Sequence, residues 1–296
     1  MLNGARGYTV LEMLVALTLS AIVITLVASV GLRQQRFHRD VVAATERLEQ
    51  LDQATALVPV ALRSIAPGEG DIPPGGARDT SLEFRATIAT AVVCDSGRGS
   101  LVLAPVGTGP PRLSSILERP VAGDTAWWLA KVGAGEAWTP QSIAGVIDST
   151  TSCLIGGVAP WPSRASLQSL VLRVALPVPP AKGMPVRITR SWKYSIYRAS
   201  DGKWYLGARD WNPGTLRFNI IQPVSGPFIS AAARGVAFRY YDSAGVAISS
   251  GSSTTRDIAV IQVAFSVDSA LPGQFTHAIG VRGTTITSIA LRNRRR

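Results

Sequence analysis

The sequence predicts an α+β protein, in which one long transmembrane and amphipathic helix at the N-terminus packs on a mainly antiparallel β domain. Residues 9–32 are almost wholly apolar, and apolar residues then recur mostly three or four positions apart as far as residue 65, which is the period of a helix with one buried face. From about residue 71 the period changes to two, which is typical of strands. Roughly 230 residues follow the helix, enough to bury a full core as one large or two packed β units.

The apolar run is long enough to cross a membrane. At about 1.5 Å rise per residue, its 24 residues span roughly 36 Å, against about 30 Å for the hydrocarbon core of a bilayer. A secretory signal peptide has an apolar core of only about 7 to 15 residues, so an uncleaved anchor fits the run better. Glu12 is the charged residue in this apolar run. Its presence needs a reason, because inserting a charge at mid-bilayer costs about 2.5 to 3.5 kcal/mol. A plain anchor would merely tolerate Glu12 near one interface.

The residues before the apolar run form a specific pattern. A short polar leader ends at Gly7, the aromatic Tyr8 follows, and Glu12 lies at the start of the apolar helix. This pattern resembles the N-terminus of type IV prepilins. The resemblance implies that a prepilin peptidase cuts between Gly7 and Tyr8 and methylates the new amino terminus of Tyr8. The usual first mature residue in the family is Phe, so Tyr8 is a mild departure.

The same resemblance gives Glu12 a role. It implies that this carboxylate meets the terminal amine of a neighbouring subunit as the subunit joins a filament. Tyr8 and Glu12 are four residues apart, so on a helix they project from one face, and the positive end of the helix dipole favours a carboxylate there.

The chain is expected to divide into a leader (1–7), the N-terminal helix (8–66) and a β-rich extracytoplasmic domain (67–296), with a candidate internal boundary at 177–185. Pro59 is expected to kink the last turns of the helix, and the segment 67–70 (PGEG) is expected to end it. The apolar stripe of the helix beyond the membrane consists of Phe37, Val41, Ala44, Leu48, Leu51, Leu57, Val58, Leu62 and Ile65.

Alternating patterns predict the strands. Strands are expected around residues 82–88 and 186–196, and Asp201-Gly202 predicts a hairpin turn after the second of them. Further strands are expected within 234–248, 257–267 and 277–291. The strand order resembles that of J-type minor pseudopilins of type II secretion and W-type minor pilins, and the absence of proline from residues 8 to 58 also favours a minor subunit.

The two cysteines, Cys94 and Cys153, both follow the anchor. If the β domain lies outside the cytoplasm, a disulfide between them is favoured, and closing a loop of about 60 residues would stabilise the fold by roughly 4 kcal/mol. The alternative is two buried free thiols. Their spacing gives no support to a structural zinc site, and we expect neither metal nor cofactor.

The residue types give little support to catalysis. His38 and His277 are the two histidines of the chain, which leaves few places for a nucleophile–base pair. Asp and Glu are scattered rather than paired on motifs. We therefore expect no enzyme and no small-molecule substrate.

The positive charge is concentrated in one half of the chain. Residues 151–296 hold 18 Lys and Arg against 5 Asp and Glu, a balance of +13, whereas residues 1–150 hold 12 against 14, a balance of −2. Such a surface would neutralise phosphates, so a DNA-binding minor pilin of a DNA-uptake system is an alternative. Otherwise the arginines simply solvate the sheet, or meet acidic partner subunits or lipid headgroups. The basic C-terminal residues are Arg292, Arg294, Arg295 and Arg296.

The resemblance thus implies a structural minor subunit of a type II secretion pseudopilus or a type IV pilus. Its expected partners are other pilins or pseudopilins, prepilin peptidase and the inner membrane, with a secreted substrate or DNA as further candidates. As a single-pass inner-membrane protein it would keep its leader in the cytoplasm. Arg33, Arg36 and Arg39 after the apolar run favour the opposite orientation, but long following domains translocate largely regardless of such counts.

Overall fold

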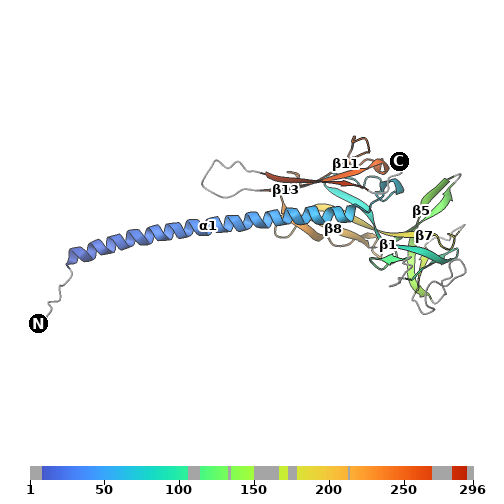
Figure 1. The fold of residues 1–296 in the computed structure, drawn as a ribbon, viewed down its shortest axis with the longest axis horizontal. Helices are drawn as coiled ribbons and strands as arrows, with labels where there is room; N and C mark the ends of the chain where they lie inside the picture. Colours follow the sequence, from blue (N-terminus) through green and yellow to red (C-terminus); the bar gives the residue numbers. More distant parts are fainter. Residues whose placement is uncertain are drawn as a thin grey trace. The chain divides into compact units, whose positions relative to one another are not determined.

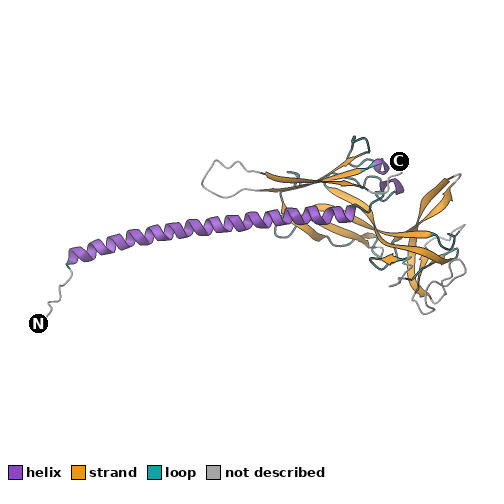
Figure 2. Cartoon of the chain, in the orientation of Figure 1, coloured by secondary structure: helices purple, strands orange, loops and turns teal. Residues whose placement is uncertain are grey.

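The computed structural model describes residues 9–105, 114–132, 135–149, 167–172, 179–212, 214–268 and 282–291 (Figure 1). One long helix precedes strands that are paired antiparallel, which confirms the α+β class (Figure 2). The chain falls into two compact units, one formed by residues 1–49 with 269–282 and the other by residues 50–268 with 283–296. The division between the units falls inside the long helix.

Helix α1 (Val10–Leu62) runs through Pro59 and ends three residues later. The helix therefore ends earlier than the sequence pattern predicts. The PGEG segment instead forms the short 3-10 helix η1 (Pro67–Glu69), which Gly70 closes in the left-handed conformation with φ of 89°. Glycine suits this position because it has no Cβ to clash.

Within the described residues, fourteen strands and a second 3-10 helix, η2 (Thr255–Asp257), follow η1. The strands are β1 (Ser81–Ser96), β2 (Ser100–Leu103), β3 (Ser115–Ile116), β4 (Thr125–Val132), β5 (Gly135–Ser149), β6 (Leu167–Leu172), β7 (Pro185–Arg198), β8 (Trp204–Asn212), β9 (Arg217–Phe218), β10 (Gln222–Phe228), β11 (Val236–Tyr241), β12 (Ala247–Ile248), β13 (Val260–Asp268) and β14 (Arg282–Ala290). They confirm the strands expected around 82–88 and 186–196 and within the three later segments.

The β7–β8 hairpin confirms the turn predicted at Asp201-Gly202. Arg198 and Trp204 face each other across its closed end, and Gly202 has a φ of 78°. The Asp201 Oδ1 atom accepts a hydrogen bond from the Lys203 N–H at 2.9 Å, which fixes the turn in the way that aspartate side chains commonly do.

In the part of the chain that the structure describes, the larger sheet contains ten strands, and six of them close into a ring. The ring runs β7–β4–β5–β6–β2–β1 and returns to β7, and every pairing in it is antiparallel. The C-terminal half of β7 and the N-terminal half of β1 extend beyond the ring, where β8 and then β10 add to β7. Strands β1 and β7 are therefore shared between a small barrel and an open sheet.

A bulge in β1 keeps the apolar residues of this strand on one face of the sheet, both in the open sheet and in the barrel. Before the bulge, even-numbered residues of β1 pair with even-numbered residues of β7: Leu82 with Tyr194 and Phe84 with Trp192. After the bulge, which lies between Thr87 and Ala89, odd-numbered residues of β1 pair with the even-numbered residues of β7. One extra residue reverses the alternation of side chains along a strand. This is why both even- and odd-numbered apolar residues of β1 are buried.

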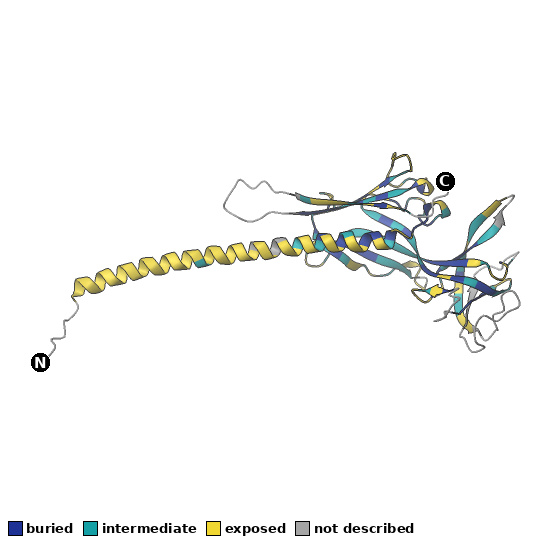
Figure 3. Cartoon of the chain, in the orientation of Figure 1, coloured by how far each residue is buried: buried dark blue, intermediate teal, exposed yellow. Residues whose placement is uncertain are grey.

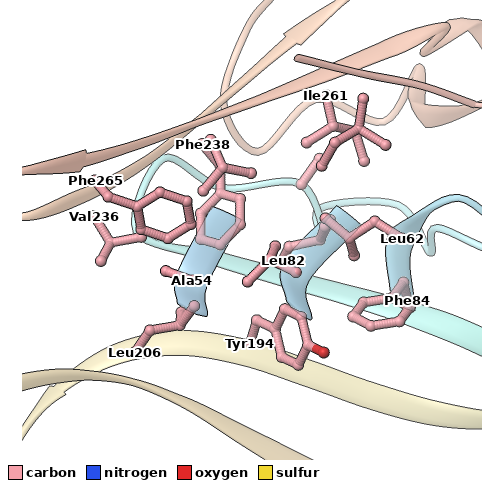
Figure 4. Packing of buried hydrophobic residues seen from close by; sticks show 14 of the residues in the cluster. Ala54, Leu62, Leu82, Phe84, Tyr194, Leu206, Val236, Phe238, Ile261 and Phe265 are labelled. Atoms are coloured by element: carbon pink, nitrogen blue, oxygen red, sulfur yellow. The ribbon is translucent and has the colours of Figure 1, made fainter. Parts of the chain in front are cut away.

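Two hydrophobic clusters correspond to the barrel and the open sheet. The cluster inside the barrel includes Trp128, Ile143 and Ile188. The second cluster lies between the open sheet, the end of α1 and a four-stranded sheet of order β12–β11–β13–β14. Figure 4 shows Ala54 and Leu62 of α1 between the side chains of these two sheets.

Candidate assembly site

A reciprocal pair of hydrogen bonds closes the first turn of α1. The Thr9 N–H donates to Glu12 Oε2 at 3.3 Å, and the Glu12 N–H donates to Thr9 Oγ1 at 3.3 Å. This arrangement is a capping box, in which each side chain satisfies a backbone donor that the helix leaves unpaired. Thr9 is not among the residues predicted for the site, although the signal, a threonine three residues before a glutamate, is present in the sequence.

The capping box orients the Glu12 carboxylate but uses only one of its two oxygens as a hydrogen-bond acceptor. Both contacts from Thr9 to the carboxylate fall on Oε2, and Oε1 has no hydrogen-bond partner among residues 9–105. The side chain is exposed. One carboxylate oxygen therefore caps the helix while the other is open to a further donor, such as a protonated amine. Gly7 and Tyr8 lie outside the described residues, so the cleavage and methylation positions stay predictions.

The helix that follows Glu12 presents apolar residues on all sides. From Val10 to Arg39 it is long and apolar enough to cross a membrane, and its residues are exposed apart from the half-buried Gly31 (Figure 3). An apolar surface of this extent is unfavourable in water and marks a membrane or protein contact.

The apolar stripe beyond the membrane segment is buried in only part of its length. Leu51, Val58, Leu62 and Ile65 are buried in the second unit, as predicted. By contrast, the predicted stripe residues Phe37, Val41, Leu48 and Leu57 are exposed, and the Ala44 side chain lies outside the described residues. The exposed positions are available to pack against other proteins.

A buried ion pair ties the segment after α1 to the β domain. Arg187 of β7 donates from Nη1 to Asp71 Oδ2 at 2.9 Å and from Nη2 to Asp71 Oδ1 at 3.0 Å. Its Nη2 also lies 3.0 Å from Glu69 Oε2. Asp71 Oδ2 in turn accepts a hydrogen bond from the Ala66 N–H at 2.8 Å. One carboxylate thus fixes the chain as it leaves α1 and holds it against β7.

Two tryptophan rings surround the Arg187 guanidinium on the outer face of the barrel. Its Cζ lies 5.4 Å from the ring centre of Trp127 and 5.8 Å from that of Trp138, within the range of cation–π attraction. Burial raises the pKa of the Asp71 carboxyl above its usual value, although Arg187 lowers it. In general a buried ion pair adds little net stability, because removing two charges from water costs about as much as their attraction returns, whereas removing one partner is strongly destabilising.

A second arginine of β7, Arg190, forms ion pairs with two carboxylates. Arg190 donates from Nε to Asp124 Oδ1 and from Nη2 to Asp124 Oδ2, both at 2.9 Å, and its Nη1 contacts Glu118 Oε2 at 2.6 Å. The hydrogen bonds that Arg190 donates to Asp124 are the main reason that the pKa of Arg190 is raised. On the surface, Lys182 Nζ lies 3.0 Å from Asp95 Oδ1.

These ion pairs neutralise part of the positive charge of residues 151–296. Each joins a base from the basic half of the sequence, Arg187, Arg190 or Lys182, to carboxylates from the other half. Part of the positive charge counted in the sequence is therefore neutralised within the fold. The candidate DNA contacts Arg292, Arg294, Arg295 and Arg296 lie outside the described residues.

The remaining predicted site residues are only partly described. Cys94 is buried on β1 and disulfide-bonded, while Cys153 lies outside the described residues, so their pairing stays a prediction. His38 is exposed on α1, and His277 lies outside the described residues. Among the residues that the structure describes, no group of three or more His, Cys, Asp or Glu side chains is arranged to hold a metal.

The comparison with protein families agrees with the N-terminal pattern. Residues 2–28 match the model of the prokaryotic N-terminal methylation motif. The matched range contains Gly7, Tyr8 and Glu12. No curated protein and no solved structure matches the chain.

The motif, together with the long apolar helix that follows it, indicates a type IV prepilin-like protein. The same two features fit a membrane-anchored protein that interacts with prepilin peptidase and with other pilins.

Proposed function

We propose that this protein is a structural minor subunit of a type II secretion pseudopilus or a type IV pilus. It would be assembled through its N-terminal helix after prepilin peptidase has removed residues 1–7. The observation that carries this proposal is the methylation motif at residues 2–28. The β domain would then lie on the extracytoplasmic side of the inner membrane, and the mechanism would be filament assembly rather than catalysis.

The position of Glu12 supports a filament subunit over a plain anchor. A plain anchor would gain only the helix cap from this carboxylate, against the cost of inserting a charge. In a filament, Glu12 Oε1 would accept a hydrogen bond from the methylated Tyr8 amine of a neighbouring subunit. The attraction between the two charges is strong where lipid and helices exclude water.

The exposed apolar residues farther along α1 support the same proposal. Phe37 and Leu48 are 70% and 63% exposed, in a stretch where the apolar period of the sequence predicts a buried face. Neighbouring helices of a filament would cover these side chains and so remove the cost of exposing them to water.

The DNA-binding alternative has less support. The sequence alone suggests a balance of +13 for residues 151–296, but Arg187 and Arg190 are engaged by carboxylates of the same chain. These two arginines are not free to neutralise phosphates.

Processing and assembly test the proposal together. A C-terminally tagged chain would be produced in cells with and without prepilin peptidase, and intact mass and presence in sheared filaments would be measured. We expect the peptidase-containing cells to yield a chain that lacks residues 1–7, carries one added methyl group, and sediments with other prepilin-like subunits. A chain that stays unprocessed, or one that is processed but never enters filaments, would rule out the proposal.

A deletion would distinguish the two kinds of filament. Loss of protein secretion with intact surface pili would assign the subunit to a pseudopilus, and loss of surface pili with intact secretion would assign it to a type IV pilus.

A further inference from the structure

The described strands that end the two sheets differ in how well they are protected. Strands β3, β9 and β12 are two residues long, and β10 contains Pro223 and Pro227 and departs from regular register. Short strands, prolines and bulges all prevent an edge from pairing with another chain. Strand β14 has none of these protections, because it is nine residues long and contains neither proline nor any charge after Arg282.

Two contacts define how β14 lies against β13. The Leu291 N–H donates to the Ala259 carbonyl at 3.0 Å, and the hydroxyls of Ser266 and Thr284 lie 3.0 Å apart. Both contacts fit one antiparallel register. The backbone groups of successive residues point alternately toward the partner strand and away from it. In this register the odd-numbered residues of β14 direct their backbone groups toward β13.

The even-numbered residues therefore direct their N–H and C=O groups to the outer edge of the sheet. Their side chains are exposed, and that of Ile286 is 54% exposed. The even-numbered residues are Thr284, Ile286, Ser288 and Ala290.

We propose that this outer edge of β14 accepts an extended segment of a partner protein as an additional strand. Main-chain hydrogen bonds would supply the affinity, as in other cases of strand addition. The sequence from 282 to 296 contains five arginines, which stand on both sides of the uncharged stretch, and no carboxylate. The partner segment therefore has an uncharged, β-branched centre and acidic residues at its ends.

The partner that fits this role is a co-assembling filament subunit, and this identification rests on the proposed function. Strand addition itself does not. The two are tested separately, because peptide binding to the purified chain requires neither cleavage after Gly7 nor Glu12.

The probe is a fluorescent peptide of alternating threonine and valine with aspartate and glutamate at its ends. Binding to the full-length chain in detergent would be measured by anisotropy, beside a peptide with lysines at its ends and one with a central proline. We expect the lysine-ended peptide to bind at least about tenfold more weakly, since like charges repel, and the proline-containing peptide not to bind.

Hydrogen exchange locates the bound strand. The peptide should slow exchange of the amides of Ile286 and Ser288, which face the open edge, and leave that of Thr287 unchanged. A structural effect of binding elsewhere in the sheet would not produce this alternation.

The variant Ile286→Lys places a charge on the edge and should weaken binding by at least about tenfold. Val246→Lys is its control, because Val246 is similarly exposed, at 61%, but lies in the turn before β12. Undiminished binding by Ile286→Lys, or no binding of the acidic peptide to the wild type at about 1 mM, would overturn the proposal. A dimer of the wild type that Ile286→Lys abolishes would assign the edge to a second copy and also overturn it.

Discussion

Arg187 and Asp71 face each other through two parallel hydrogen bonds, of 2.9 and 3.0 Å, between the guanidinium and the carboxylate. The two residues are 116 positions apart in the sequence. Asp71 follows the long helix, and Arg187 lies on a strand that is shared by the barrel and the open sheet. The pair therefore fixes where the helix is attached to the β domain.

Arg187→Met should destabilise the β domain by about 3 to 5 kcal/mol, because it leaves the buried Asp71 carboxylate without its partner. The double variant Arg187→Met with Asp71→Asn should recover much of this loss, since the fully buried residue 71 then carries no charge. Urea unfolding of the full chain in detergent, followed by tryptophan fluorescence, measures both changes. A double variant no more stable than Arg187→Met would contradict the role assigned to the charge.

The loss of stability caused by Arg187→Met should depend on pH. Burial raises the pKa of the Asp71 carboxyl above its usual 3.8, and removing Arg187 raises it further. A carboxyl with a raised pKa contributes most to stability below pH 3.8, and this contribution is lost as the pH rises through the folded-state pKa. The variant should therefore come closest to the wild type in acid. An equal deficit at every pH would show that lost packing, and not the buried charge, is responsible.

Gly7→Val should block processing of the leader. The resemblance to prepilins places the cut after this glycine, where a branched side chain would obstruct the peptidase. Intact-mass analysis should show residues 1–7 retained and no methyl group on Tyr8, whereas Ala5→Val in the same leader should be processed normally. Normal cleavage of Gly7→Val would place the cut elsewhere.

Glu12→Leu should be cleaved and anchored but should fail to capture partner prepilins in crosslinking experiments. Removing the carboxylate eliminates a desolvation cost, so insertion should not suffer, but it leaves an incoming amine without a partner. Thr9→Val is the matched control, because it removes the hydroxyl of the capping box while it keeps the carboxylate. Undiminished capture by Glu12→Leu would mean that the carboxylate serves only the helix end.

Non-reducing peptide mapping should recover Cys94 linked to Cys153. In the chain-entropy model this bond contributes roughly 4 kcal/mol, so Cys153→Ser should lower the urea midpoint of the β domain. Reduction of the wild type should lower it by a similar amount. Alkylation of both cysteines in the native protein without prior reduction would exclude the bond.

The sequence by itself determined the helix, strands β1, β7, β8 and β11 to β14, and the N-terminal motif, because these depend on local period and on residues adjacent in the chain. The 3.6-residue period predicts α1, and Asp201-Gly202 predicts its turn from local conformational preference alone. The helix continues past Pro59, as the pattern predicts, but it ends at Leu62 instead of reaching the PGEG segment.

Only the tertiary structure decided how the strands close into a barrel and which charges are neutralised. Strand β7 pairs with β4 along one half and with β8 along the other, and periodicity carries no information about the choice of partner. For the same reason, counting charges along the chain suggested a free basic half, whereas Arg187 and Arg190 are held by carboxylates from the opposite half. Charges pair across space at distances of a few ångströms, whatever their separation in sequence.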